Sequence, residues 1–406
     1  MKCPECDIPL KGDELVCPNC LARLPARPSD EGPESSPAYT VSPDQPKPGI
    51  DVFLRRVPWR RLLLIGSLIA ALFVAYMMWE TFFHVRPEDY LDRGDDLYDQ
   101  GHFESALAAY QRASEADPDM AAAYERAGWC YYQLQFDDAA VAQFRQAIAQ
   151  EPDFAEAHLG LGQSLYYQRR YEEAEEALRR AIELAPGQAA GHAYLGSVYF
   201  LQQRYSDAIP PLQEAVALDP TDGDSLEFLG RAYYELGQTE SALGPLSRAQ
   251  KLKPRDTEVL EDLTLTFMKR EDYVQAAETA WQLLAAEPYN PRYHLYLGQS
   301  LYYQGNLSEA EGQFHEALLW MQATGVEATA YHYLGLAAYQ AGRYQDAIQA
   351  LKSAVLLDSD NPESYAHLGW SYVYLERCAD ARPAFETALA LNPDLALAQE
   401  GLEACP

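Results

Sequence analysis

A period of 34 residues organises most of this chain of 406 residues. The octapeptide LGQSLYYQ occupies residues 161–168 and recurs at 297–304, a separation of 136 residues or four periods. Repeat units begin at residues 87, 121, 155, 189, 223, 257 and 291, and, after one unit of 37 residues, at 328 and 362. The eighth residue is Gly in every unit except the sixth, which has Thr264, and the twentieth is Ala in all nine. Such a period indicates similar structural units that stack along the chain.

The residue types in each unit predict two antiparallel helices. Apolar residues recur at helical spacing in two stretches, for example at Leu161 and Leu165 and then at Ala174 and Leu178. Gly at position eight and Ala at position twenty leave room for two helices to cross closely. Seven units have Pro near their end, which stops the second helix. Because one helical pair cannot bury its own apolar face, the units must stack, and the sequence predicts an all-α solenoid of nine helix-turn-helix repeats.

This pattern resembles the tetratricopeptide repeat (TPR) family over residues 87–395, and residues 396–406 resemble the cap helix and tail that end such arrays. The resemblance implies a right-handed superhelix whose first helices line a concave groove that binds peptides or protein segments. The sixth unit departs most from the pattern, with Thr264 for Gly, Leu283 for Ala and a local basic cluster. A bend, a second binding patch and simple drift all remain open for it.

The resemblance also indicates which side chains face or edge the groove, near the ends of the first helices. The candidates are Tyr98, Trp129, Tyr132, Gln163, Tyr166, Tyr167, Phe200, Arg231, Tyr234, Gln299, Tyr302, Tyr303, Tyr339, Trp370 and Tyr374. Tyr and Trp provide large, rigid contact area at low entropy cost, which suits recognition. Packing between repeats is the other explanation for the tyrosines, whereas indoles such as Trp129 and Trp370 are unusual at their positions. The Lys and Asn residues that would clamp a carboxylate are absent from the corresponding places.

Four cysteines in the first 24 residues predict a metal site. Cys3, Cys6, Cys17 and Cys20 form two CPxC pairs, with Lys11-Gly12-Asp13 between them as a turn. Two such pairs suit the tetrahedral thiolate shell of structural zinc, and the pattern resembles a short zinc ribbon. Two disulfides or a redox CxxC are the alternatives. We therefore expect a structural zinc ribbon over residues 1–24, because a segment this short and polar needs metal to fold.

A membrane span is predicted between this ribbon and the repeats. Residues 25–58 form a linker with seven prolines at 25–48, and residues 59–83 form the predicted transmembrane helix, uncharged from Leu62 to Trp79. A secretory signal peptide fits less well because a long polar segment precedes the apolar run. Four arginines precede this uncharged run and acidic residues follow it, so the positive-inside rule places the ribbon in the cytoplasm and the repeats outside.

Charge and composition limit the function classes. The net charge of -30 lies entirely after residue 86, because residues 1–86 carry ten basic and ten acidic side chains. Such a field disfavours nucleic acid as a partner of the repeats. His158, His192 and His294 occupy the fourth place of their units without a recurring Ser, Asp or Glu partner, so no enzyme is expected. The sequence favours a membrane scaffold in the inner membrane of a bacterial envelope, with a protein or peptide ligand; regulation of an envelope enzyme and transmembrane signalling are the alternatives.

Two cysteines near the C-terminus raise a separate question. Cys378 opens the second helix of the ninth unit and Cys405 ends the expected cap helix, which should run antiparallel to it. In an oxidising compartment the two thiols could pair and stabilise the open end of the array by about 3 kcal/mol. The alternative is two unpaired thiols, with Cys405 frayed near the terminus. Cys130 is expected to be a small core residue.

Overall fold

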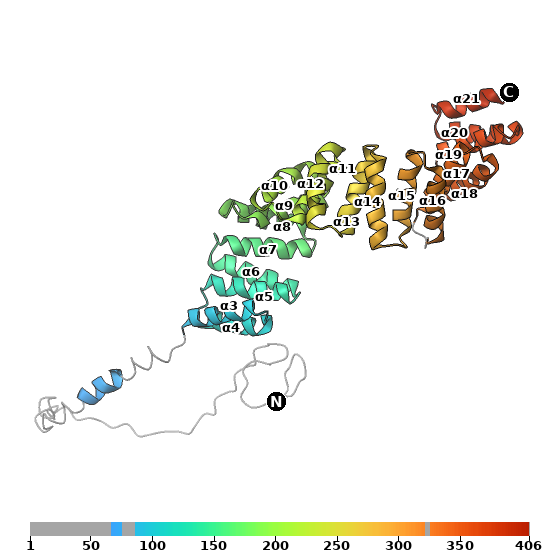
Figure 1. Ribbon diagram of the computed structural model, residues 1–406. Helices are drawn as coiled ribbons and strands as arrows, with labels where there is room; N and C mark the ends of the chain where they lie inside the picture. Colours follow the sequence, from blue (N-terminus) through green and yellow to red (C-terminus); the bar gives the residue numbers. More distant parts are fainter. Residues whose placement is uncertain (1–65, 75–85, 321–324, 406) are drawn as a thin grey trace, which may run out of the picture. The chain divides into compact units, whose positions relative to one another are not determined.

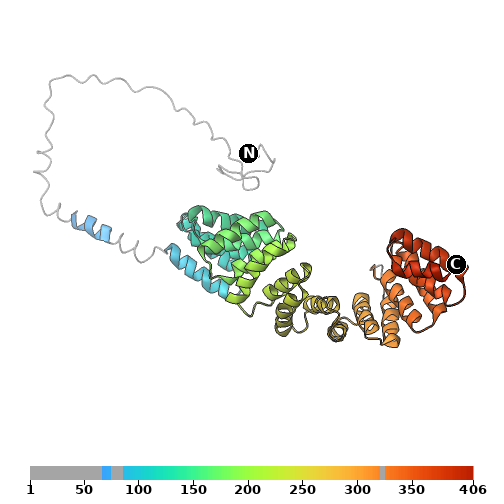
Figure 2. The same ribbon diagram turned by 90° about the horizontal axis from the view of Figure 1, so that it is seen from above.

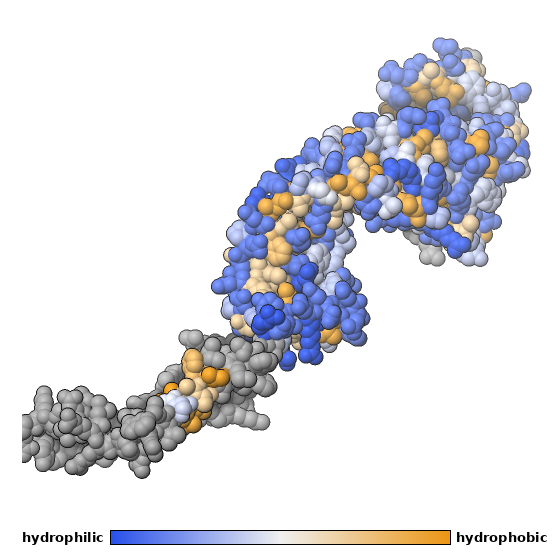
Figure 3. Space-filling view, turned by 60° about the vertical axis from the view of Figure 1, so that its left-hand side comes forward, coloured by the Kyte–Doolittle hydropathy of each residue, from blue (hydrophilic) through white to orange (hydrophobic). Residues whose placement is uncertain are grey.

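The computed structural model describes residues 66–74, 86–320 and 325–405, and the chain divides into two compact units, Met1–His84 and Val85–Pro406. In the first unit, residues 66–74 form a helix of mainly apolar residues (Figure 3). No helix of the described segments is both long enough and apolar enough to cross a membrane. The predicted span at 59–83 is described only over this stretch. The predicted linker at 25–58 and zinc ribbon at 1–24 lie outside the described residues.

The second unit consists of helical pairs in chain order (Figures 1 and 2). The first helices of the pairs are α3 (Pro87–Asp99), α5 (Ala121–Gln133), α7 (Ala155–Tyr167), α9 (Ala189–Leu201), α11 (Gly223–Glu235), α13 (Thr257–Lys269), α15 (Pro291–Tyr303), α17 (Glu327–Gln340) and α19 (Pro362–Val373). The second helices are α4 (Phe103–Ala116), α6 (Asp137–Gln150), α8 (Tyr171–Leu184), α10 (Tyr205–Leu218), α12 (Thr239–Leu252), α14 (Tyr273–Ala286), α16 (Leu307–Leu319), α18 (Tyr344–Leu357) and α20 (Cys378–Leu391). Helix α21 (Ala396–Ala404) follows the last pair.

The helix boundaries agree with the 34-residue period. Eight of the nine first helices begin at the residue where the sequence places a unit start, and α17 begins one residue earlier, at Glu327. Each second helix packs on the first helix of its own unit and on the helix that follows it, which for α20 is α21. The all-helical solenoid predicted from the sequence is therefore confirmed for the second compact unit, which contains all nine repeats.

Close packing explains the glycine at position eight. A Cβ built on Gly298 would lie 2.5 Å from a ring carbon of Phe314, and one on Gly369 would lie 2.5 Å from Phe385. In each unit that has this glycine, the facing side chain lies sixteen residues later and is Tyr, Phe or Leu. The small residue thus lets the two helices of a unit approach over a large apolar side chain.

The sixth unit reverses this size pattern. Thr264 stands in place of Gly, and the residue sixteen places later is Ala280; both are fully buried. The Thr264 hydroxyl lies 2.8 Å from the Leu260 carbonyl oxygen and 2.8 Å from the Thr279 hydroxyl. The larger side chain on α13 is therefore offset by a smaller one on α14, and its polar atom is satisfied.

The turn between the two helices of each unit contains one residue with a positive φ. It is always the fifteenth residue: Gly101, Gln135, Arg169, Gln203, Gly237, Glu271, Gly305, Gly342 and Glu376. This left-handed conformation favours Gly and disfavours other L-residues. Five units nevertheless have a longer side chain there, so stacking of the helices holds the turn against its local preference.

Three histidines join neighbouring units. The Nε2 atoms of His158 and His192 each lie 2.9 Å from the carbonyl oxygen of the proline that closes the preceding unit, and that of His294 lies 3.0 Å from its equivalent. Gln399 in α21 donates to the Pro393 carbonyl oxygen in the same way. These fourth-position side chains therefore have a structural role.

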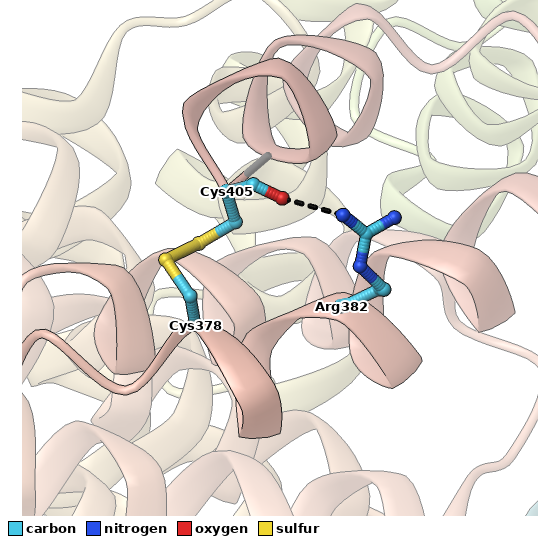
Figure 4. The surroundings of a disulfide bond; sticks show 3 residues. All are labelled: Cys378, Arg382 and Cys405. Carbon is cyan, nitrogen blue, oxygen red and sulfur yellow. Dashed lines mark hydrogen bonds between the residues drawn. A yellow bond between two sulfur atoms is a disulfide. The ribbon is translucent and has the colours of Figure 1, made fainter.

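Helix α21 closes the C-terminal end and is held by a disulfide (Figure 4). Cys378 and Cys405 are bonded, with their α-carbons 5.3 Å apart, so the geometric requirement for pairing is met. Arg382 donates to the Cys405 carbonyl oxygen at 2.7 Å, and the Trp370 indole N–H donates to that of Leu397 at 2.8 Å. Cys130 is a free, fully buried thiol, as expected.

Candidate functional site

The predicted groove residues lie on the first helices, except Tyr374, which directly follows α19, and most are half-buried. Gln163, Phe200 and Tyr302 are buried, whereas three tyrosines at the thirteenth position of their units are the most exposed of the tyrosines in this set. Tyr167, Tyr303 and Tyr374 have exposed fractions of 54%, 48% and 53%. The set therefore combines packed side chains with exposed rings.

One aromatic cluster spans α5, α7 and α9. The ring of Tyr167 lies 5.8 Å from Tyr132 and 5.1 Å from Tyr166, between ring centroids. Tyr194 of α9 joins both tyrosines of α7, at 5.4 Å from Tyr166 and 6.4 Å from Tyr167. Trp129 extends the cluster at 5.5 Å from Tyr132. These edge-to-face contacts fix the rings while leaving one side of Tyr167 in solvent.

Two further clusters lie toward the C-terminus. Tyr303 stacks on Tyr273 at 4.5 Å and contacts Tyr302 and Tyr333 at 5.2 and 6.0 Å. In the next cluster, Tyr374 stacks on Tyr344 at 4.5 Å, and its ring lies 5.8 Å from Tyr339 and 6.0 Å from Trp370. Each exposed tyrosine thus rests on the ring that begins a second helix or on the ring of a neighbouring first helix.

The middle of the array is different, because charged groups replace the tyrosine clusters. The Arg231 guanidinium lies 5.0 Å from the ring centroid of Phe200, and Phe228 packs on the same ring at 5.3 Å. Arg231 also lies 3.5 Å from an Asp262 carboxylate oxygen and 3.7 Å from one of Glu227. Burial raises the pKa of Asp262 to about 7 in spite of Arg231, and it raises the pKa of Glu227 as well.

The remaining predicted residues are not brought into these clusters. Tyr98 packs on Phe103 at 5.2 Å and accepts a hydrogen bond from Gln133. Tyr234 lies under the ammonium of Lys269, 4.5 Å from the ring centroid. The basic cluster of the sixth unit therefore contacts the groove residues through Lys269. The side chains of Gln163 and Gln299 are not members of the aromatic clusters in the described repeats.

Both unusual indoles have structural contacts. Trp129 donates to the buried carboxylate of Glu125 at 2.6 Å and packs on Phe144 at 5.2 Å. Trp370 packs on Phe385 at 5.9 Å and donates to the cap helix. Both are half-buried, so each indole supports the fold with one part and faces the surface with another.

Several members of the surface were missed from the sequence. Tyr194, Phe228, Tyr333 and His367 lie in or beside the clusters. All four occupy the sixth position of their units, so the period itself contained the signal. Side chains at position six meet those at position twelve of the preceding unit, a contact that depends on how units stack.

The polar side chains in the described part of the chain are not grouped as metal ligands. No group of three or more His, Cys, Asp or Glu side chains there is placed to hold a metal ion. Burial raises the pKa of Tyr166 to about 12, so its hydroxyl stays neutral at physiological pH. The chemistry that this surface offers is non-covalent contact through aromatic rings and hydroxyl groups.

The comparisons with known proteins match this architecture. Residues 73–332 match the family described as the cilia and flagella-associated protein 70 C-terminal domain. Residues 335–374 match a TPR repeat family and residues 367–402 a tetratricopeptide repeat family. No protein of curated function matches the chain.

Several solved structures are similar to this chain. The APC/C hetero-tetramer Cut9–Hcn1 is 15% identical, with a TM-score of 0.45, over 79% of this chain and 76% of that one. PilF of Pseudomonas aeruginosa is 22% identical, with a TM-score of 0.46, over 51% and 94%. A tetratricopeptide repeat protein from Parabacteroides merdae is 19% identical, with a TM-score of 0.44, over 62% and 98%.

Proposed function

Because this chain is a tetratricopeptide repeat protein that belongs to the family of the cilia and flagella-associated protein 70 C-terminal domain, we propose that it is a non-catalytic scaffold. Its ligand is an extended segment of a protein partner, bound along the first helices α3 to α19. The observation that carries the proposal is the exposure of Tyr167, Tyr303 and Tyr374, which the fold supports with neighbouring rings but does not bury. Rigid, half-exposed aromatic side chains of this kind are typical binding hot spots.

Removal of the three exposed rings is expected to abolish partner binding. A photo-reactive amino acid at Tyr167 or Tyr303 in living cells should cross-link one partner. In the otherwise native chain, Tyr167→Ala combined with Tyr303→Ala and Tyr374→Ala should reduce recovery of that partner at least tenfold, since a hot-spot aromatic side chain contributes about 2 kcal/mol or more.

Trp281 provides a matched control, because its indole is equally exposed, at 54%, but lies on the second helix α14. Trp281→Ala should leave recovery unchanged. Equal loss from the triple variant and from Trp281→Ala, or no loss from either, would refute binding through the first helices. The identity of the partner then separates two of the candidate roles: a structural component of the envelope favours scaffolding, and an enzyme favours regulation.

We also propose that residues 59–83 anchor the protein in a bacterial inner membrane, with the repeats outside the cytoplasm. The support is the uncharged run from Leu62 to Trp79 with four arginines before it. Alkaline phosphatase fused after Asp96 is expected to be active, and a cytoplasmic fluorescent reporter at the same place should be dark. The opposite pattern of reporter activities would reverse the orientation.

We propose, finally, that Cys3, Cys6, Cys17 and Cys20 hold one structural zinc ion per chain. Full-length protein purified under reducing conditions should contain one equivalent of zinc by elemental analysis. Cys17→Ser combined with Cys20→Ser should remove it, because two thiolates cannot complete a tetrahedral site, whereas Cys130→Ala should retain it. Zinc retained by the double variant would contradict the assignment.

A further inference from the structure

A pocket of about 380 Å³ opens between α3 and α5, the first helices of the first and second repeat units. Its lining consists of Asp95, Tyr98, Asp99, Arg126 and Trp129. Tyr98 and Trp129 belong to the predicted groove surface, so the pocket lies at the N-terminal end of the proposed binding path. Its lining combines two aromatic side chains with charged groups, which the tyrosine clusters farther along do not.

The charges at this pocket do not balance. Arg126 lies 3.1 Å from an Asp95 carboxylate oxygen and 3.6 Å from one of Glu125, a side chain only 2% exposed. Asp99 has no ion-pair or hydrogen-bond partner among the described residues. The lining therefore contains two carboxylates for one guanidinium, and that guanidinium is also paired with Glu125 beside the pocket. Helix α3, PEDYLDRGDDLYD, adds to this surplus, because it contains six acidic residues and a single Arg.

The aromatic walls are held in place. The Trp129 indole N–H donates to Glu125 at 2.6 Å, and its ring packs edge-to-face on Tyr132 and Phe144. A carboxylate at the N–H edge of an indole makes the ring face more electron-rich, which strengthens its attraction for a cation. Tyr98 is fixed by Phe103 and by the hydrogen bond from Gln133. The pocket is therefore preorganised before any ligand enters.

We propose that this pocket binds a lysine or arginine side chain of the partner segment, so that the partner is basic at the N-terminal end of the groove. The inference rests on the proposed function. A cation gains the aromatic faces of Trp129 and Tyr98 together with the carboxylates of Asp95 and Asp99. An anionic side chain would be repelled by the same carboxylates, and a neutral one would contact the rings without gaining the charge attraction of Asp95 and Asp99.

The test uses the full-length protein in nanodiscs of zwitterionic lipid and two fluorescent probe peptides. One is a twelve-residue alternation of arginine and glycine, and the other replaces each arginine with citrulline, its uncharged isostere. The arginine peptide is expected to bind at least tenfold more tightly at low salt. Asp99→Asn should weaken that binding several-fold, and Asp119→Asn is the control, because it removes the same charge from an exposed turn outside the pocket.

Arg126→Gln gives a result that structural damage would not imitate. Because Arg126 is the resident cation, its removal is expected to tighten binding of the arginine peptide about threefold or more. Equal binding of the two peptides, equal effects of Asp99→Asn and Asp119→Asn, or weaker binding by Arg126→Gln would each overturn the inference. Cross-linking at Tyr303 with no selectivity for the arginine peptide would refute the pocket alone and leave the scaffold proposal intact.

Discussion

Acidification from pH 7 to pH 4 is expected to destabilise the repeats around His332 and His367 by about 3 kcal/mol for each histidine. His332 lies on α17 and His367 on α19, and burial lowers the pKa of both imidazoles to about 4. In the unfolded chain each returns to its ordinary value near 6.5. The unfolded state therefore binds protons first, so the stability that is complete above about pH 6.5 is lost as the pH falls toward 4.

The surroundings of the two imidazoles offer little to a positive charge. Nδ1 of His332 lies 2.7 Å from the Ser364 hydroxyl oxygen, and its ring packs edge-on against Tyr333 at 5.2 Å. His367 packs on Tyr339 at 5.2 Å, and its Nδ1 atom is buried without a hydrogen-bond partner. For His332, burial is the main cause of the lowered pKa, the charge of His367 lowers that pKa further, and Asp358 opposes this effect. Protonation would therefore place a cation where burial keeps water from solvating it.

The middle of the array is expected to respond with the opposite sign. Burial raises the pKa of Asp262 on α13 to about 7, well above the value of an exposed carboxyl group. Its folded state holds the proton more tightly than the unfolded state, so local stability near α13 rises as the pH falls from about 7 to 4. Repeats open locally, and one chain can show both responses.

Amide hydrogen exchange at a series of pH values, corrected for the intrinsic exchange rates, would measure both changes in local stability. Protection of residues 327–373 should fall on acidification while that of 257–269 is kept or rises. His367→Phe should remove about half of the acid sensitivity, and Asp262→Asn should remove the opposite trend near α13. Unchanged protection of 327–373 between pH 7 and pH 4 would contradict the assignment of the buried histidines.

The repeat architecture could be predicted because its signal is redundant. Glycine at position eight reflects one contact, with the large side chain sixteen residues later, and that contact is repeated along the array. A single exception such as Thr264 could not shift the frame. The structure was needed to explain Thr264, however, because it shows that the facing residue is the small Ala280, which makes room for the larger Thr side chain.

The turns show where sequence reasoning stops. Gly237 and Gly305 mark a left-handed residue in the usual way, but Gln135, Arg169 and Glu376 adopt the same conformation. Their identity carries no local signal, since tertiary packing imposes the backbone angle. The same distinction applies to the residues of the candidate binding surface. Positions twelve and thirteen were found from the period, while sixth-position partners such as Tyr194 depend on stacking between units.

Loss of the disulfide between Cys378 and Cys405 is expected to destabilise the C-terminal end of the array by about 3 kcal/mol, because it frees the intervening loop in the unfolded state. The bridge joins the first residue of α20 to the residue that follows α21, across 27 positions. Helix α21 has nine residues, and an isolated helix of that length is unstable in water. Its attachment therefore depends on the bridge and on its packing against α19 and α20.

Detachment of α21 is expected to change the packing and mobility of residues outside the cap helix. Gly401 lies against the ring of Phe385, which also fills the space at Gly369, so the cap covers the last buried aromatic of the array. Trp370 loses its hydrogen bond to the Leu397 carbonyl oxygen when α21 leaves. Because Trp370 contacts Tyr374, we expect the exposed ring of Tyr374 to become more mobile in the same event.

Hydrogen exchange before and after treatment with a phosphine reductant would measure this effect. Reduction should lower protection of residues 378–404 and have little effect on units nearer the N-terminus, since repeats couple mainly to their neighbours. Cys378→Ala combined with Cys405→Ala should match the reduced protein and show no further response to the reductant. Cys130→Ala is the control, because this buried thiol is outside the bridge. Equal protection of α21 in the oxidised, reduced and double-variant proteins would show that packing alone holds the cap.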